Sequence, residues 1–245
     1  MNNRKNENGF ISFHLGCDLG KENDFTAICF LRKFTPLDRR SRVNGSSVYE
    51  VLMMKRFALK TSYVQIVSEI SNRLKRAPFD GWQDNFGIRH PSKIPTFLAF
   101  DQTGVGQSVS ELLRNDAFLD TRLEQLYAIN ITAGREPSEG SDFLNIPKRD
   151  LIMNCLIAFE KGYLQFAGDM PELPLLIDEL QNFEMRFTAK GNSTFSAKGS
   201  TNHDDLVLSL SLAVWSAKNT DESFDEDLPL KKAILWSGKH SPSRF

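Results

Sequence analysis

Apolar and polar residues alternate along the first quarter of the chain, a pattern that predicts β-strands. Residues 10–18, 25–34 and 48–59 form three such segments, which short polar connections join into an antiparallel meander. A continuous apolar run at 96–100 is typical of a buried parallel strand, and 126–131 supplies a fifth strand. The first part of the chain therefore predicts a mixed sheet.

Helical spacing of apolar residues follows each group of strands. The predicted helices cover 63–74, a segment through Val109 and Leu113, 147–160 and 171–180. Residues 183–197 alternate around a glycine and predict a hairpin. Two polar stretches that contain glycine or proline predict loops, 77–95 and 133–146. The loop over 133–146 is expected to be mobile. Strands interleaved with helices indicate an α/β sheet flanked by helices on both faces.

The stretch 201–215 predicts one further helix, and its start is unusually charged. It is almost uninterruptedly apolar after Asp205 and contains no glycine or proline, as in a helix buried on most of its surface. One of the two polar residues before His203 is the expected N-cap, which places Asp204 and Asp205 in the first turn. Capping accounts for one acid. A whole His-Asp-Asp group at the start of a buried helix must be hydrated, paired or bound to metal.

Length and composition favour one large globular domain, or one domain with a small appendage. The chain has 245 residues, of which 40% are hydrophobic and 25% charged. Lys and Arg total 30 against 31 for Asp and Glu, so no overall positive charge attracts nucleic acid and only a local patch is possible. We expect a disordered lead at 1–9, a domain at 10–218 and a loosely attached tail at 219–245.

The cysteines and the N-terminus indicate an intracellular protein. Cys17, Cys29 and Cys155 form no Cys-x-x-Cys pair and lie among apolar residues, which predicts buried free thiols in a reducing compartment. The first residues lack the apolar centre of a signal peptide, and no apolar run is long enough to cross a bilayer. The expected location is the cytoplasm, without a membrane partner.

Two predicted strands end in aspartate. Asp18 is the last residue of the first strand, and the fourth strand stops at Asp101. In open α/β sheets, sites gather at the strand ends where the strand order switches. If the two strands are neighbours, both carboxylates emerge at the same edge. The helix that follows His203 then needs only to start near that edge to add a third carboxylate.

Three converging carboxylates predict a metal centre. They repel one another unless a divalent cation lies between them, and hard oxygen ligands suit Mg²⁺ or Mn²⁺. Two such ions about 4 Å apart activate a water and stabilise the leaving oxygen in phosphodiester hydrolysis. A single aspartate at a strand end is more often a turn or cap residue, so the metal hypothesis depends on the whole set.

Five segments, in this order, resemble the nuclease domain of phage terminase large subunits. They are 16–18, 24–27, 100–106, 147–151 and 203–207. The resemblance covers roughly residues 10–217. It implies an RNase H-like fold, related to that of Holliday-junction resolvases, and cleavage of DNA with acidic metal ligands.

The resemblance also implies roles for single residues. Asp18 and Asp101 would bind metal, and the third ligand would come from Asp204 or Asp205. Consecutive helical positions point about 100° apart, so one of the two is expected to face the metal directly. We favour Asp205, with Asp204 supporting the site or binding the second ion. His203 either orients water or the scissile phosphate, or is simply a polar residue at a helix start.

Several basic residues are candidate DNA contacts, although a solvated side chain is the alternative for each. Lys148 lies at a helix start, where a cation is poorly placed relative to the helix dipole. The others lie on two predicted hairpins that would straddle a duplex; they are Arg39, Arg40, Arg42, Lys190 and Lys198.

The chain departs from full terminase large subunits because it carries no Gly-x-x-x-x-Gly-Lys-Ser/Thr phosphate loop. We therefore expect a nuclease without its own ATPase motor, either as part of a terminase or as a stand-alone relative. The favoured hypothesis is a metal-dependent DNA endonuclease with little sequence preference that acts in viral DNA packaging. Its expected partners are double-stranded DNA and a packaging ATPase, a portal or a small terminase subunit. The alternatives are a structure-selective, resolvase-like nuclease and a non-catalytic module that binds DNA or a partner.

Overall fold

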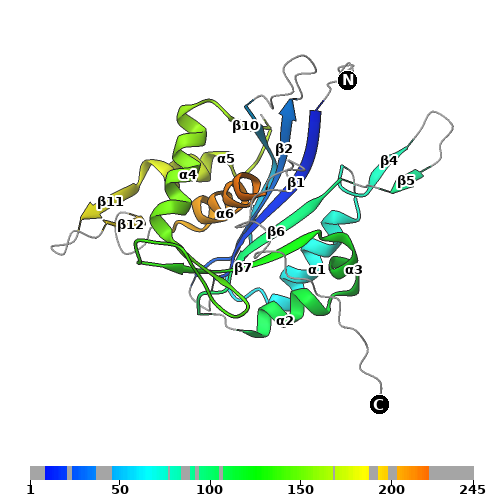
Figure 1. The fold of residues 1–245 in the computed structure, drawn as a ribbon, viewed down its shortest axis with the longest axis horizontal. Helices are drawn as coiled ribbons and strands as arrows, with labels where there is room; N and C mark the ends of the chain where they lie inside the picture. Colours follow the sequence, from blue (N-terminus) through cyan, green and yellow to red (C-terminus); the bar gives the residue numbers. More distant parts are fainter. Residues whose placement is uncertain are drawn as a thin grey trace, which may run out of the picture.

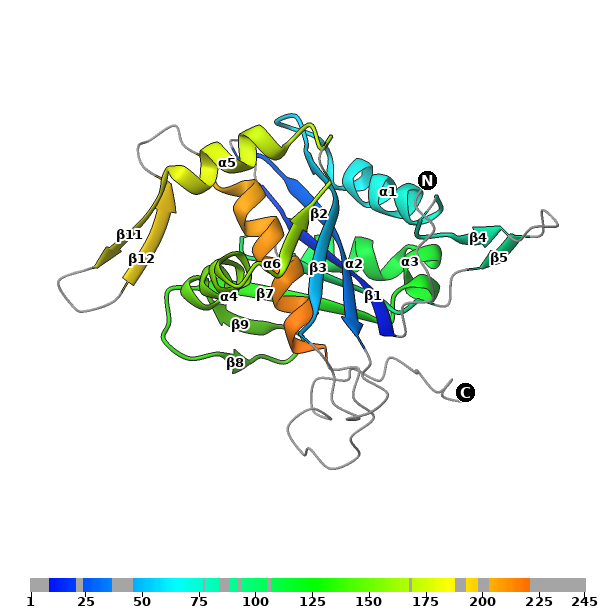
Figure 2. The same ribbon diagram turned by 90° about the horizontal axis from the view of Figure 1, so that it is seen from above.

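A mixed β-sheet with helices on both faces forms the centre of the molecule (Figures 1 and 2). The computed structural model describes residues 9–20, 24–36, 46–76, 78–83, 89–91, 94–104, 107–167, 169–187, 193–197 and 203–220. Within these ranges, eight strands pair in the order β10-β3-β2-β1-β6-β7-β9-β8. This arrangement confirms the predicted α/β class with a mixed sheet.

The middle of the sheet agrees with the predicted strand order. β1, β2 and β3 form the antiparallel meander, and β6 joins β1 in parallel, followed by β7. The bounds are Gly9–Asp18 for β1, Ala27–Pro36 for β2, Val48–Arg56 for β3, Thr96–Asp101 for β6 and Gln125–Thr132 for β7. The first and fourth predicted strands are therefore direct neighbours, as the convergence of Asp18 and Asp101 requires.

The edges of the sheet are formed by short strands, and those of one edge lie where a loop was predicted. β9, Leu144–Pro147, runs parallel to β7 and carries the short β8, Ser138–Glu139, so a loop over 133–146 is wrong. Ile146 is buried in this edge, which gives the segment a reason to pair. On the opposite edge, β10, Leu164–Phe166, pairs with β3.

Two small hairpins lie outside the main sheet. β11, Phe183–Phe187, and β12, Ser193–Ala197, form the predicted hairpin, whose turn lies outside the described residues. β4, Gly81–Gln83, and β5, Arg89–Pro91, form a second hairpin within the stretch predicted as a loop.

The helices divide between the two faces (Figures 1 and 2). One face carries α4, Lys148–Glu160, α5, Leu173–Gln181, and α6, Asp205–Asn219. The other carries α1, Tyr63–Leu74, α2, Gln107–Asn115, and α3, Ala117–Arg122. The sequence did not predict α3, a six-residue helix whose first turn is capped by the Asp116 carboxylate through the amides of Phe118 and Leu119.

Alternation along β1 separates two cores. Phe13 and Leu15 pack with α1 and α2, whereas Gly16 lies beneath α6. A Cβ at Gly16 would lie 1.9 Å from the Ser209 carbonyl oxygen and 2.5 Å from the Ala213 amide nitrogen. Because only glycine permits this approach, α6 rests directly on the backbone of β1. Residues 205–217 of the helix are all buried, as its apolar sequence predicted.

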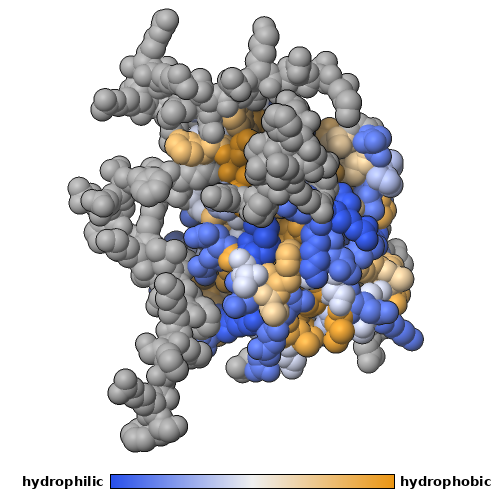
Figure 3. Space-filling view, turned by 90° about the vertical axis from the view of Figure 1, so that its right-hand side faces the viewer, coloured by the Kyte–Doolittle hydropathy of each residue, from blue (hydrophilic) through white to orange (hydrophobic). Residues whose placement is uncertain are grey.

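The remaining expectations meet the structure only in part. All three cysteines are free and buried. Gly9 begins β1 and Asn219 ends α6, and most of the predicted lead and tail lies outside the described residues. Among the helices that the structure describes, none has the length and apolarity to cross a bilayer. The face seen in Figure 3 mixes hydrophilic and hydrophobic side chains.

Candidate active site

Asp18 and Asp101 lie abreast at the ends of adjacent parallel strands. The register pairs Cys17 with Phe100, so the next residue of each strand is an aspartate. Gly16 and Ala99, two positions earlier, both face α6. Because side chains alternate along a strand, both carboxylates point to the α6 face. Each residue is only 8% exposed.

α6 begins beside this pair and adds two more carboxylates. Asp204 occupies its N-cap position, and Asp205 is its first residue and is 5% exposed. Burial raises the pKa of Asp18 well above its usual range, and the charges of Asp101, Asp205 and Asp204 raise it further. The structure thus brings the four predicted carboxylates together, and they repel one another there.

Hydrogen bonds hold Asp101 in place. Burial raises its pKa, while hydrogen bonds from Thr103 and the Ile131 amide and the charge of Lys148 act in the opposite direction. The Thr103 amide donates to Asp101 Oδ1 at 2.8 Å, and the Thr103 hydroxyl oxygen accepts from the Ile131 amide at 2.8 Å. The turn after β6 is therefore tied both to the carboxylate and to β7.

The carboxylates at the start of α6 do not cap that helix. The Asp204 side chain makes no capping hydrogen bond and instead accepts from Lys148 Nζ at 2.7 Å. The amides of Leu206 and Val207 donate to Oε2 of Glu179, on α5, at 3.0 and 3.1 Å. The predicted cap before His203 is therefore wrong, because Asp204 holds the N-cap position and Glu179 supplies the accepting oxygen.

Asp205 is paired with an arginine. Arg56 Nη2, at the end of β3, lies 2.9 Å from Asp205 Oδ2, and the guanidinium lies 4.2 Å from the centre of the Phe25 ring. Burial raises the pKa of Asp205, and the charge of Arg56 opposes that rise. His203 Nδ1 lies 3.9 Å from the same Oδ2, and its ring meets Phe25 edge-on at 4.7 Å.

Sequence reasoning missed Arg56, Glu179 and Phe25. Arg56 ends a predicted strand and Glu179 lies inside a predicted helix, where charged residues are usually solvated. The one available signal was the charge excess of the His-Asp-Asp group, which had to be hydrated, paired with a cation or bound to metal.

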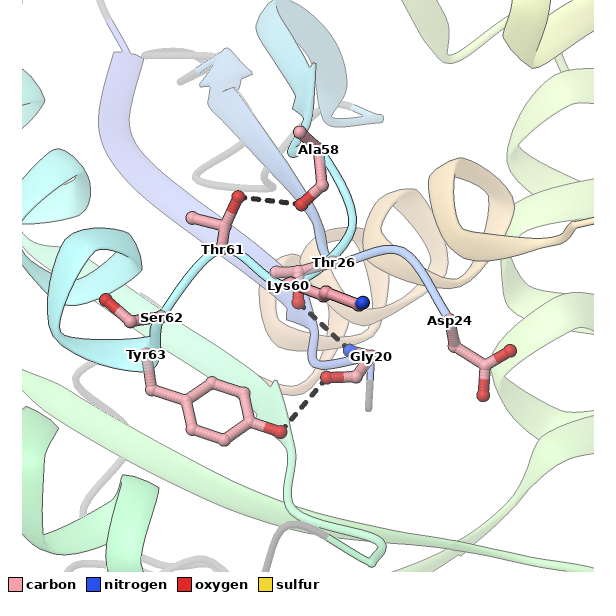
Figure 4. Close-up of a pocket in the computed structure, with 8 residues that line it drawn as sticks. All are labelled: Gly20, Asp24, Thr26, Ala58, Lys60, Thr61, Ser62 and Tyr63. Atoms are coloured by element: carbon pink, nitrogen blue, oxygen red, sulfur yellow. Dashed lines mark hydrogen bonds between the residues drawn. The ribbon is translucent and has the colours of Figure 1, made fainter. Parts of the chain in front are cut away.

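A hollow of about 400 Å³ lies beside the end of β1 (Figure 4). The Gly20 amide donates to the Thr26 hydroxyl oxygen at 3.0 Å, and the Tyr63 hydroxyl donates to the Gly20 carbonyl at 3.0 Å. Figure 4 shows both side chains directed at Gly20, with Lys60 and Asp24 on the same hollow. These bonds fix the backbone two residues beyond Asp18.

The donor set fits a hard divalent cation, although the side chains do not enclose one as they stand. Among the described residues, no three histidine, cysteine, aspartate or glutamate side chains are arranged closely enough to hold a metal ion. The same residues give the Asp18 carboxylate no hydrogen bond or ion pair, and its pKa is raised by its acidic neighbours. Buried carboxylate oxygens that repel one another are suitable ligands for Mg²⁺ or Mn²⁺.

Of the basic residues predicted to contact DNA, the structure describes only Lys148. Lys148 begins α4 and pairs with Asp204, which explains a cation at a helix start. Arg39, Arg40, Arg42, Lys190 and Lys198 lie outside the described residues.

Comparison with known sequences identifies relatives of this chain. No protein-family model matches it. The chain is 41% identical over 117 residues to the large terminase subunit of Thermus phage G20c, a match that covers 48% of this chain and 20% of the relative. The matched part is thus a fifth of the relative's length.

Solved structures share the fold. The large terminase nuclease of the thermophilic phage G20c with bound magnesium superposes with a TM-score of 0.54 and 20% identity, over 86% of this chain and 88% of that one. The human cytomegalovirus terminase nuclease domain, soaked with Mn and inhibitor-bound, superposes with a TM-score of 0.51 and 12% identity. This match covers 86% of this chain and 85% of that one. The chain is therefore similar in sequence to a terminase large subunit over about half of its length, and it shares the RNase H-like fold of the terminase nuclease domains.

Proposed function

We propose that this chain is a metal-dependent DNA endonuclease that acts in viral DNA packaging. The observation that carries the proposal is the convergence of Asp18, Asp101 and Asp205 from β1, β6 and α6 at one edge of the sheet. The large terminase nuclease of phage G20c, which has this fold, has been crystallised with magnesium. We assign the activity to residues 10–218, which contain no Gly-x-x-x-x-Gly-Lys-Ser/Thr phosphate loop.

The three aspartates would hold Mg²⁺ or Mn²⁺, in a two-ion arrangement. Such ions supply an activated water and neutralise charge on the scissile phosphate. Asp18 is the ligand between Asp101 and α6, and its repulsion with them is relieved when a cation is bound. Asp101 is held for this role by Thr103. Asp204, paired with Lys148, supports the second ion.

His203 and Lys148 contribute beside the carboxylates. His203 is partly exposed and lies beside Asp205, where it orients a water or the scissile phosphate. Lys148 lowers the pKa values of Asp18 and Asp101 and so favours their ionised, ligand-competent forms. Arg39, Arg40, Lys190 and Lys198 remain proposed contacts with the DNA backbone.

A cleavage assay tests the proposal. Wild-type protein with Mn²⁺ is expected to nick and linearise supercoiled plasmid, and Asp101→Asn to lose about 100-fold or more, because support residues alone are worth 10–100-fold. Asp120→Asn, an exposed acid on α3, is the matched control and should cleave like wild type. Equal nicking by wild type and Asp101→Asn contradicts the proposal.

Two alternatives are distinguished by further substrates and by binding. A structure-selective resolvase would prefer a four-way junction over linear duplex. A non-catalytic module would bind DNA without cleaving it, and Mn²⁺ would not raise its melting temperature. The endonuclease is expected to be stabilised by Mn²⁺, since the ion binds only the folded state.

The setting of the reaction belongs to the same proposal. The expected substrate is double-stranded DNA in the host cytoplasm. A packaging ATPase, a portal or a small terminase subunit would deliver it.

A further inference from the structure

The first turn of α6 is held by a carboxylate from another helix. Glu179, on α5, is 4% exposed and accepts hydrogen bonds from two α6 amides through Oε2. An anion at this position is favoured by the helix dipole. The side chains of Asp204 and Asp205 are therefore released from the capping role that acidic residues usually have at a helix start.

Arg56 links this cap to the candidate site. Its Nη2 lies 2.9 Å from Asp205 Oδ2 and 3.7 Å from Glu179 Oε1, so one nitrogen lies between two carboxylates. The guanidinium is fixed from a third side by the Phe25 ring. β3, α5 and α6 thus meet at a single arginine.

Both basic contacts of Asp205 use the same oxygen. Arg56 and His203 approach Oδ2, at 2.9 and 3.9 Å. A carboxylate whose Oδ2 is engaged in this way is restricted in rotation and offers Oδ1 to a further partner.

We infer that Arg56 and Glu179 are positioning residues that hold Asp205 as a one-oxygen ligand for the divalent cation. The inference rests on the proposed function, since it requires a cation at the site. Glu179 fixes the helix turn that carries Asp205, and Arg56 fixes the carboxylate itself.

The direction in which Mn²⁺ affinity changes when Arg56 is replaced separates a positioning role from simple charge compensation. Arg56 is a cation beside the site, so removing its charge strengthens the attraction for Mn²⁺. Loss of positioning weakens Mn²⁺ binding, by about 10–100-fold for residues that orient a ligand. Arg56→Gln is therefore expected to bind Mn²⁺ about 10-fold or more weakly, against the electrostatic trend.

The test measures the Mn²⁺ concentration that half-maximally raises the melting temperature. The variants are Arg56→Gln, Arg56→Lys and, as the matched control, Lys55→Gln, which removes one positive charge from the neighbouring, half-buried Lys55–Glu69 pair. Arg56→Lys keeps the charge and lacks the planar fork, so an intermediate weakening is expected. Lys55→Gln should match wild type. At saturating Mn²⁺, the DNA-cleavage rate of Arg56→Lys should return most of the way to the wild-type rate.

A metal-free measurement keeps the inference testable on structure alone. Burial raises the pKa of Glu179 to about 7, so the measurement is made at a pH well above that value, where Glu179 is ionised. There Glu179→Gln replaces a charged acceptor by a neutral one, which forms hydrogen bonds roughly half as strong. Hydrogen exchange at the Leu206 and Val207 amides should become severalfold faster in EDTA.

The outcomes separate the two claims. Mn²⁺ binding by Arg56→Gln that equals or exceeds wild type overturns the positioning role, as does unchanged exchange at Leu206 and Val207 in Glu179→Gln. A wild-type protein that does not respond to Mn²⁺ overturns the proposed metal site, and the inference with it; that failure appears in wild type, whereas the others appear only in the variants.

Discussion

Asp18 is the carboxylate for which the folded chain offers least compensation. Asp204 is paired with Lys148, Asp205 with Arg56, and Asp101 accepts a hydrogen bond from Thr103. Among the residues that the structure describes, Asp18 has only the more distant charge of Lys148 against three acidic neighbours. Its ionisation therefore opposes folding of the metal-free protein.

Asp18→Asn is expected to leave the metal-free protein as stable as wild type or more stable. The folded pKa of Asp18 lies above its unfolded value, so wild type loses stability as pH rises through the folded pKa, whereas asparagine does not ionise. In EDTA the melting temperature of the variant should exceed that of wild type increasingly between pH 5 and 9. A relief of about 1 kcal/mol corresponds to about 2–4 °C. A variant less stable than wild type at pH 9 contradicts this explanation.

His14 is a buried histidine whose effect on stability has the opposite pH dependence to that of Asp18. Its Nε2 lies 2.9 Å from the Ser12 hydroxyl and its Nδ1 lies 2.9 Å from the Ser216 hydroxyl, and the ring stacks on Phe97. Burial lowers its pKa well below 6.5, and the charge of Lys33 lowers it further. The folded state thus excludes a proton that the unfolded chain accepts.

Stability that depends on neutral His14 is present above about pH 6.5 and is lost as pH falls towards the lowered folded pKa. His14→Gln cannot take up that proton. The difference in unfolding free energy between wild type and His14→Gln, measured by urea denaturation, should be largest at pH 7.5 and shrink towards pH 5. A difference that is constant over this range would show that His14 does not titrate as described.

At the scale of elements, the contact between β1 and α6 determines where the third carboxylate lies. The helix backbone approaches β1 at Gly16, two residues before Asp18. Because the helix rests on this glycine, its first turn is carried to the strand ends. A side chain at position 16 would lift α6 and displace Asp205 from Asp18.

Gly16→Ala is therefore expected to destabilise the protein by about 1–3 kcal/mol or more, since the added Cβ meets backbone atoms that cannot move aside. Gly134→Ala is the control, because its Cβ would meet only the Thr132 hydroxyl at 3.3 Å. Thermal unfolding measures both variants. A Gly16→Ala protein as stable as the control would show that the close approach is not needed.

The elements that were predicted are those whose pattern is local. The alternation in 10–18 and the apolar run in 96–100 predicted β1 and β6, and both end in aspartate as expected. β9 was missed because its pairing with β7 depends on a partner 15 residues away, which no local pattern encodes. α3 was missed because six residues are too few to show helical periodicity.

The same distinction applies to the candidate site. Four carboxylates were predicted because strand ends and a helix start are visible in sequence. Arg56 and Glu179 were not, because their partners lie 149 and 27 residues away. The residue that caps α6 also depends on tertiary contacts. The Asp204 side chain accepts a hydrogen bond from Lys148, and Glu179 accepts the hydrogen bonds of the helix amides.

In the molecule as a whole, the sheet separates an apolar core on one face from the candidate active site on the other. α1, α2 and α3 cover one face with a closed apolar core, and α4, α5 and α6 cover the other, where the carboxylates meet (Figure 2). The formal net charge of −1 gives no general attraction for DNA, so binding must depend on local cations.

Anomalous diffraction from crystals soaked in Mn²⁺ tests the central claim most directly. We predict a peak bound by Asp18, Asp101 and Asp205, with Arg56 still on Oδ2 of Asp205, and a second peak nearer Asp204. Crystals of Asp101→Asn should lose the first peak. Wild-type crystals with no manganese between Asp18 and Asp101 at saturating Mn²⁺ would contradict the metal-dependent nuclease proposed here.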